Sequence, residues 1–244
     1  MSRLAVMQPY FFPYIGYFQL IAAVDLFVVY DNIKYTKKGW INRNRLLQNG
    51  KDVMFSLPLK SDSDSLDVRE RTLAPDFSRS KLLAQFQGAY RKAPYFAQTY
   101  PLVEQIVQHE DDNLFGFLHH SIVRTCAHLG IATEIRKSSD IAIDHGLKNQ
   151  DKVLALCAAA GASTYVNAIG GMALYANARF EEMGVQLRYL KSRAFEYPQF
   201  GDPFLPWLSI VDVMMFNSAK ETRAAVTGNF DCIENISRDL ATEK

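Results

Sequence analysis

The segment QPYFFPYIGYFQLI (residues 8–21) combines side chains that bind ligands with residues that stiffen the backbone. A turn with a purely structural role is normally polar, whereas this one is dominated by aromatic residues. Pro9 and Pro13 fix φ and make it rigid, and Gly16 lets a ligand or another backbone approach closely. A helix starting here would offer free N–H groups and a positive dipole to an anion such as phosphate. The competing interpretation is a hydrophobic lid over a sheet edge. The candidate binding residues are Gln8, Pro9, Tyr14, Gly16 and Tyr17.

A basic and polar segment follows at residues 31–45, with the sequence DNIKYTKKGWINRNR. Arginine side chains hold phosphate or carboxylate groups through paired hydrogen bonds, and a neighbouring ring could stack on a base or a sugar. The alternative is a solvated basic loop, which is the usual fate of a charge run. The candidate binding residues are Lys37, Trp40, Asn42, Arg43, Asn44 and Arg45. Lys34 is a candidate catalytic residue that would neutralise phosphate.

Two further clusters place polar groups at a strand end and inside an apolar run. The turn after Asn167 could present N–H groups to an anion, although an ordinary connection fits the same residues. Asp212 lies in the apolar run 208–216, where an unpaired acid is costly, so it should either cap a helix or pair with a cation. The candidate binding residues of these clusters are Asn167, Gly170, Gly171, Tyr175 and Gln199.

Asp31 and Asp212 are the candidate catalytic bases. An amine attacks only in its neutral form, and a positioned carboxylate with a raised pKa could accept its proton. The sequence contains no GxSxG, P-loop or GxGxxG motif. Its histidines and three cysteines lack the spacing of metal ligands or disulfide pairs. We therefore predict no metal site.

The hydrophobic pattern supplies a strand–helix–strand unit that could hold these segments. Residues 4–7 and 25–30 are apolar runs typical of buried parallel strands, and residues 15–24 have the pattern of a helix. A right-handed crossover brings both strand ends to one edge of a sheet, where open α/β sheets bind ligands. Gln8 to Tyr17 and Asp31 should therefore share that edge.

The rest of the chain continues the α/β pattern. We predict strands at 52–59, 65–73, 132–136, 163–167 and 185–191, and helices at 149–160, 172–183 and 208–216. A tight turn is expected at Gly170-Gly171. Residues 77–129 should form a helical insertion in three segments, 77–92, 97–108 and 112–129. Residues 1–244 are expected to be a single α/β domain with a mainly parallel sheet.

Composition narrows the functional classes. Of the 244 residues, 48% are hydrophobic and 22% are charged, and the net charge is +1. That balance is typical of a globular protein and argues against a surface devoted to nucleic acid or anionic lipid. The N-terminal apolar stretch is too short for a signal peptide, no run suits a membrane span, and the cysteine usage fits a reducing compartment. We expect a soluble, cytoplasmic protein that binds a small molecule.

Four strings of the sequence resemble the WbqC-like protein family: QPYFFPYIGYFQLI, DLFVVYDNIKYTKKGWINRNRLL, YVNAIGG and FLPWLSIVDVMMFN. The resemblance runs essentially end to end. Members of that family are associated with bacterial surface-polysaccharide gene sets, so the resemblance implies a role in making or decorating a glycan such as an O-antigen or capsule.

The strand–Pro–aromatic–Gly–helix layout also resembles, more distantly, the start of the nucleotidylyltransferase and pantothenate-synthetase (HUP-type) group. That group binds ATP phosphates with an HxGH motif, whose place is taken here by Tyr14-Ile15-Gly16-Tyr17. Tyrosine can hydrogen-bond phosphate but cannot supply the positive charge of an imidazolium. The departure supports the fold and weakens the case for adenylyl transfer.

Three hypotheses about function follow. The first is an enzyme that forms an amide on a nucleotide- or glycan-linked amino sugar, as an acyl or aminoacyl transferase or an amide ligase. Its cofactor would be ATP or an already activated donor. The second is a non-catalytic subunit that binds a nucleotide sugar or a partner enzyme. The third is RNA binding, for example of an aminoacyl-tRNA donor, which the near-neutral charge disfavours.

Overall fold

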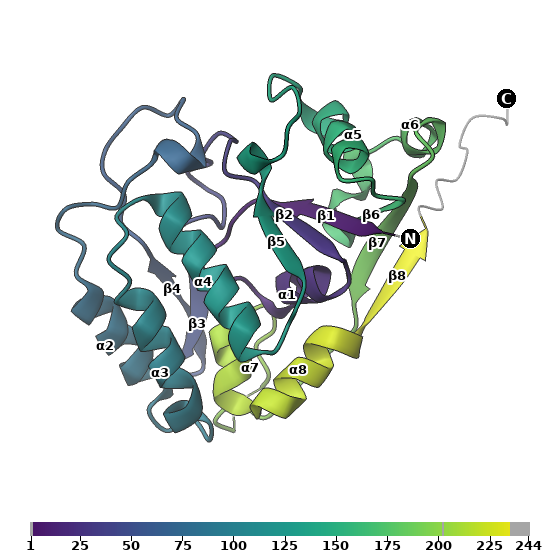
Figure 1. The fold of residues 1–244 in the computed structure, drawn as a ribbon. Helices are drawn as coiled ribbons and strands as arrows, with labels where there is room; N and C mark the ends of the chain where they lie inside the picture. The colour runs from purple at the N-terminus through teal and green to yellow at the C-terminus, as the bar shows by residue number, and fades with distance from the viewer. Residues whose placement is uncertain (1, 202, 235–244) are drawn as a thin grey trace, which may run out of the picture.

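The computed structural model describes residues 2–201 and 203–234, and a six-stranded sheet forms its centre (Figure 1). In spatial order the strands are β5 (Glu134–Lys137), β2 (Leu26–Val29), β1 (Arg3–Met7), β6 (Thr164–Ala168), β7 (Gln186–Ser192) and β8 (Phe230–Glu234). The first five are parallel, and β8 is antiparallel to β7 at one edge. The predicted α/β class with a mainly parallel sheet is confirmed.

Each face of the sheet is covered by its own apolar layer, because successive side chains of a strand point to opposite faces. Leu4 and Val6 of β1 belong to the layer formed with α5 (Asn149–Ala159) and α6 (Asn177–Glu182). Ala5 belongs to the layer formed with α1 (Ile15–Ala22), α7 (Ile210–Phe216) and α8 (Ala219–Gly228). In Figure 1, α5 and α6 lie above the sheet, and α1, α7 and α8 lie below it.

A hairpin and three helices lie beside this sheet (Figure 1). β3 (Arg43–Gln48) and β4 (Lys51–Ser56) pair antiparallel around Asn49-Gly50. Both turn residues have positive φ, 51° and 72°, a geometry that favours an Asn-Gly pair. The helices α2 (Arg79–Tyr90), α3 (Phe96–Val107) and α4 (Leu114–His128) occupy the place of the predicted insertion. Their apolar faces extend the layer around α1.

Three predictions about the elements were wrong. Residues 65–73 form no strand but a 3-10 turn at Val68–Glu70, because Asp67 and Glu70 make a capping box that starts a helical turn. Residues 172–183 form no continuous helix, since the chain is extended at Tyr175 between the 3-10 helix Ile169–Leu174 and α6. The same 3-10 helix contains Gly170-Gly171, where a tight turn was expected. We also did not predict β3, α8 or β8.

The described residues contain no helix with the length and apolar character needed to cross a lipid bilayer. They also contain no group of three or more His, Cys, Asp or Glu side chains placed to share a metal ion.

Candidate functional site

A large cavity opens at the carboxyl ends of β1, β2 and β6. The chain leaves β1 for β2 on one side and leaves β6 for β7 on the other, so a topological switch point lies between β1 and β6. Ligands of open α/β sheets bind at such points. The cavity has a volume of about 1220 Å³ and is lined by residues from all three strand ends, from the first turn of α1 and from the first turn of α5.

Four basic side chains line this cavity, from Lys34, Arg69, Lys148 and Lys152. Lys152 in the first turn of α5 is the most enclosed, with 6% of its surface exposed. Its ammonium donates hydrogen bonds to the backbone oxygen of Asn32 (3.2 Å) and to Asn32 Oδ1 (3.0 Å). It also lies 5.2 Å from the centre of the Tyr30 ring, a cation–π distance.

Lys152 takes part in none of the ion pairs formed between described residues. Burial lowers the pKa of its ammonium, and the charge of Lys148 lowers it further, whereas the charges of Asp67 and Asp31 act in the opposite direction. An enclosed cation without a directly paired counter-ion is costly. An anionic ligand in the cavity would offset that cost.

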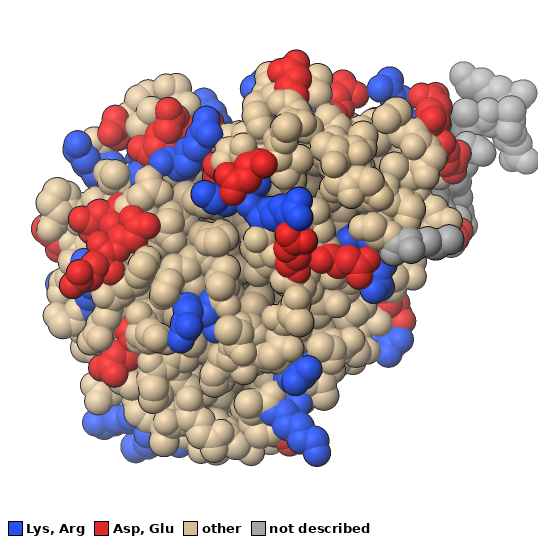
Figure 2. Space-filling view, viewed as in Figure 1, with Lys and Arg blue, Asp and Glu red and all other residues tan. Residues whose placement is uncertain are grey.

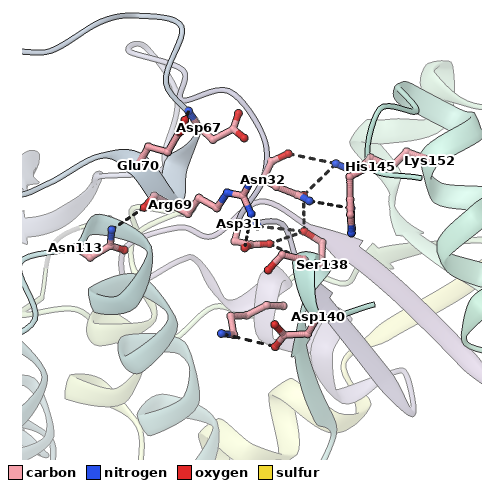
Figure 3. A network of polar contacts seen from close by, with 12 residues as sticks. Asp31, Asn32, Asp67, Arg69, Glu70, Asn113, Ser138, Asp140, His145 and Lys152 are labelled. Carbon is pink, nitrogen blue, oxygen red and sulfur yellow. Dashed lines mark hydrogen bonds and ion pairs between the residues drawn. The ribbon is translucent and has the colours of Figure 1, made fainter. Parts of the chain in front are cut away.

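Asn32 connects Lys152 to a network beneath the cavity (Figure 3). Asn32 Oδ1 accepts from Lys152 Nζ and lies 2.7 Å from Ser138 Oγ. Its amide nitrogen is therefore turned to His145 Nδ1, 2.9 Å away. That nitrogen of His145 acts as an acceptor, so a neutral ring carries its hydrogen on Nε2. The network fixes both the Lys152 ammonium and the His145 ring at the cavity wall.

Asp31 supports the network from below and is not among the residues that line the cavity. It is 3% exposed, and its Oδ1 accepts from Ser138 Oγ (2.7 Å) and the Ser139 N–H (2.9 Å). Burial alone would raise the pKa of Asp31, but the hydrogen bonds from Ser139 and Ser138 outweigh it and lower the pKa. Asp31 Oδ2 lies 4.0 Å from Arg69 Nη1. This geometry suits an ionised partner for Arg69.

The N-terminal segment forms the aromatic wall of the cavity. Gln8, Tyr14, Gly16 and Tyr17 line it, together with Tyr10, which was not predicted. Tyr17 is buried and donates its hydroxyl hydrogen to the Gln8 backbone oxygen at 2.9 Å. A Cβ atom at residue 16 would lie 2.4 Å from the Tyr14 ring, so glycine lets this side chain, rather than the predicted ligand or second backbone, lie against the start of α1. Pro9 is buried beside these residues without lining the cavity.

The turn after β6 closes the opposite side. Asn167, Gly170, Gly171 and Tyr175 all line the cavity. Asn167 Oδ1 accepts from the Ala168 N–H at 2.9 Å, and a Cβ atom at residue 171 would lie 2.3 Å from Asn167 Nδ2. The structure thus brings the β1 and β6 candidates into one site.

The candidate residues of the basic segment 31–45 lie in three different surroundings. Lys34 and Trp40 line the cavity, and Asn44 and Arg45 line a smaller pocket beside it. The other three have partners within the fold. Lys37 pairs with Asp64 at 2.7 Å, Asn42 accepts from the Tyr35 hydroxyl and donates to the Leu57 carbonyl, and Arg43 donates to the Gly39 carbonyl.

Asn44 positions the N-terminal segment. Its amide nitrogen donates to the carbonyl oxygens of Phe12 (2.8 Å) and Phe11 (3.3 Å), and its Oδ1 accepts from the Arg45 N–H. Phe12 has φ 42°, an uncommon conformation for a bulky residue, and the hydroxyl of Ser209 also donates to its oxygen. Asn44 therefore holds the backbone that presents Tyr10 and Tyr14.

We expect Asn44→Ala to lower the free energy of unfolding by about 1–3 kcal/mol, because the Phe11 carbonyl loses its side-chain donor and the Phe12 carbonyl keeps only that of Ser209. Urea denaturation would measure the loss. Met54→Ala, at an exposed position of β4, serves as a control with little expected change. Equal stability of the two variants would contradict this role for Asn44.

Asp212 and Gln199 lie in the core, away from the cavity. Asp212 is fully buried in α7 and accepts from the hydroxyls of Tyr90 (2.9 Å) and Tyr197 (2.7 Å) and from Gln199 Nε2 (2.7 Å). Burial raises the pKa of Asp212, although its three donors oppose the rise. The expectation that Asp212 caps a helix or pairs with a cation is wrong, because Ser209 caps α7 and the partners of Asp212 are neutral.

Several lining residues were not predicted: Tyr10, Tyr30, Asn32, Asp67, Arg69, His145, Lys148 and Lys152. Lys152 had one local signal, since it is the charged member of a buried helix face that includes Val153 and Leu156. The others lie in irregular segments that only the fold brings to the cavity.

A comparison with protein families identifies the family of this chain. The sequence pattern of the WbqC-like protein family matches residues 8–224. A Mycobacterium tuberculosis protein named "Uncharacterized protein Rv1507c" is 27% identical over 225 residues, which cover 91% of this chain and 96% of that protein. No solved structure matches the chain significantly. The family match includes every cavity residue from Gln8 to Tyr175, and the chain belongs to the WbqC-like protein family.

Proposed function

We propose that this protein is an enzyme of bacterial surface-polysaccharide biosynthesis that forms an amide on a nucleotide-linked amino sugar. The observation that supports the proposal most is the enclosed ammonium of Lys152, which lines the switch-point cavity and forms no ion pair with any residue that the structure describes. Arg69, Lys148 and Lys34 line the same cavity. A diphosphate is an anion that several cations bind together. The volume of about 1220 Å³ is large enough for a nucleotide with an attached sugar.

The N-terminal turn would orient the nucleotide or the acyl donor, in keeping with the HUP-type likeness of this strand–helix unit. Tyr14 and Tyr17 occupy the histidine positions of that likeness. The Tyr17 hydroxyl already donates to Gln8, so the Tyr14 hydroxyl is the better placed of the two to contact a ligand. Burial raises the pKa of Tyr14, which keeps this hydroxyl a donor at neutral pH.

In the proposed reaction the sugar amine attacks the acyl carbonyl, a C–N bond forms, and the bond to the leaving group breaks. A base must take the amine proton. Asp31 is one of the two bases that the sequence suggests, but its lowered pKa and its position below Arg69 favour a positioning role. Asp67 lines the cavity and is the carboxylate that the geometry favours as the base. ATP would serve if the donor is activated on the enzyme.

The same structure bears on two other candidate functions, a non-catalytic binding subunit and RNA binding. A non-catalytic nucleotide-sugar subunit would use the same cavity, and it is favoured by the lack of an activated thiol. Burial raises the pKa of all three cysteines, Cys126, Cys157 and Cys232, and the pKa of the first two reaches about 12. RNA binding is disfavoured because basic and acidic side chains are interspersed on the face shown in Figure 2, whereas RNA binding uses basic patches.

Calorimetric titration with nucleotide-linked amino sugars, ATP and acyl-CoA tests the proposal. We expect a nucleotide-linked amino sugar to bind, and we expect its affinity to fall as the salt concentration rises. Mixing it with the donor should give an amide product detectable by mass spectrometry. Binding without product across ATP, acyl-CoA and aminoacyl-tRNA donors would favour the binding subunit. No binding of any nucleotide-linked amino sugar would overturn the proposal.

A further inference from the structure

A second, smaller pocket adjoins the cavity. Its volume is about 250 Å³, and Tyr10, Tyr14 and Trp40 line both spaces. Trp207 and Arg45 complete its walls. Both tryptophans of the chain therefore lie at this one pocket.

Trp207 is held in a conformation that its own packing does not explain. Its φ is 63°, in the left-handed region that bulky residues rarely adopt, yet 63% of its surface is exposed. Trp40 is also exposed, at 41%. Strained residues are found preferentially at ligand sites. Arg45 Nη2 holds the Trp207 backbone by donating to its oxygen at 3.1 Å, so the indole is presented by a fixed contact.

The charge of this pocket is already balanced. Arg45 Nη1 pairs with Asp52 Oδ2 at 2.9 Å, and the guanidinium lies over the Trp40 ring, 5.4 Å from its centre. The Nε–H group of Arg45 is enclosed and has no acceptor among the described residues. That atom is closed to a ligand, and the pocket thus suits a neutral ligand rather than a second phosphate.

The angle between the Tyr14 and Trp207 rings favours one kind of neutral ligand, a sugar ring, over a flat nucleobase. Tyr14 and Trp207 meet at 62°, with centroids 6.0 Å apart, so this pair cannot sandwich a flat base. A pyranose ring has C–H groups on both faces and hydroxyls at its rim, and can contact tilted rings. We infer that this pocket binds the neutral sugar ring of the substrate or acceptor, an inference that rests on the proposed function.

Tryptophan fluorescence tests the inference because both reporters lie in the pocket. The probes are methyl glycosides of hexoses, N-acetylhexosamines and 6-deoxyhexoses, with uridine and adenosine as nucleoside probes. We expect at least one glycoside to change the emission saturably. Trp207→Ala should weaken its binding at least tenfold, with Trp40 as the remaining reporter. Phe200→Ala is the matched control, since Phe200 is also exposed (48%) with positive φ but lines neither space.

A response to nucleosides in place of glycosides, or to neither, would overturn the inference. Calorimetry with the nucleotide-linked ligand distinguishes failure of this inference from failure of the proposed function. If that ligand binds through Lys152 but no glycoside responds, the sugar pocket is wrong and the proposed function stands. If glycosides respond but no nucleotide-linked ligand binds, the proposed function is wrong and the pocket is retained.

Discussion

Lys152→Met is expected to abolish tight binding of a phosphate-bearing ligand while leaving the protein at least as stable as the wild type. Hydrogen bonds to charged groups contribute about 1.5–3 kcal/mol each. Losing the enclosed ammonium should therefore weaken binding of the nucleotide-linked ligand, raising its dissociation constant roughly 10- to 150-fold. The free energy of unfolding should instead rise, because methionine fills a similar volume without burying a charge.

The expected gain in stability is small. The Asn32 backbone oxygen loses a donor, which costs about 1 kcal/mol and offsets part of the benefit. We expect the melting temperature to rise by about 2–4 °C, equivalent to roughly 1 kcal/mol for a domain of this size. Calorimetric binding and thermal unfolding measure the two effects. Lys191→Met, at an exposed position outside the cavity, is the matched control and should change neither.

The sign of the pH dependence follows from the lowered pKa of Lys152. The unfolded chain holds the lysine proton more tightly than the folded protein does, so this group makes stability rise as pH increases from the folded pKa toward about 10.4. Lys152→Met should lack that rise when unfolding is followed at several alkaline pH values. A variant that is clearly less stable and still binds the ligand would refute the role given to Lys152.

Asp212→Ala is expected to cost about 3–5 kcal/mol of folding free energy, the largest stability effect that we predict. The substitution removes the acceptor of two tyrosine hydroxyls and one amide in a fully buried position. Each orphaned donor costs about 1–3 kcal/mol. The loss would spread through Tyr90, whose hydroxyl also accepts from the Leu47 N–H of β3 at 2.9 Å. Urea denaturation would measure it.

Asp212→Asn separates this structural role from the catalytic role that the sequence suggested. The amide keeps one oxygen for the tyrosines but turns a donor toward part of the same cluster, so an intermediate loss of about 1–3 kcal/mol is expected. Well below its melting temperature this variant should bind the ligand and turn over like the wild type. Folded Asp212→Asn protein with normal binding and no activity would instead support Asp212 as the base.

The elements that form the edge of the sheet could be predicted from sequence because they depend on local patterns. The apolar runs at β1, β2 and β6 and the helical period of α1 are visible within a few residues of each other. Parallel strands place their carboxyl ends at one edge. Gln8 and Asn167 line one cavity at this edge. β3 escaped this reasoning because its buried positions include the polar Asn44, which breaks the usual alternation.

The sequence by itself therefore determined the five parallel strands, the helices α1, α5 and α7 and the edge at which the cavity opens. The tertiary structure decided which charged groups face the cavity. Lys34 and Lys37 look equivalent in sequence, yet Lys34 lines the cavity and Lys37 pairs with Asp64. Lys152 and Asp212 both lie on buried helix faces. Lys152 reaches the open cavity, whereas Asp212 is enclosed by hydroxyl and amide donors of the core. Such differences depend on residues more than 100 positions away, such as Asn32 for Lys152 and Tyr90 for Asp212, and local periodicity carries no information about these partners.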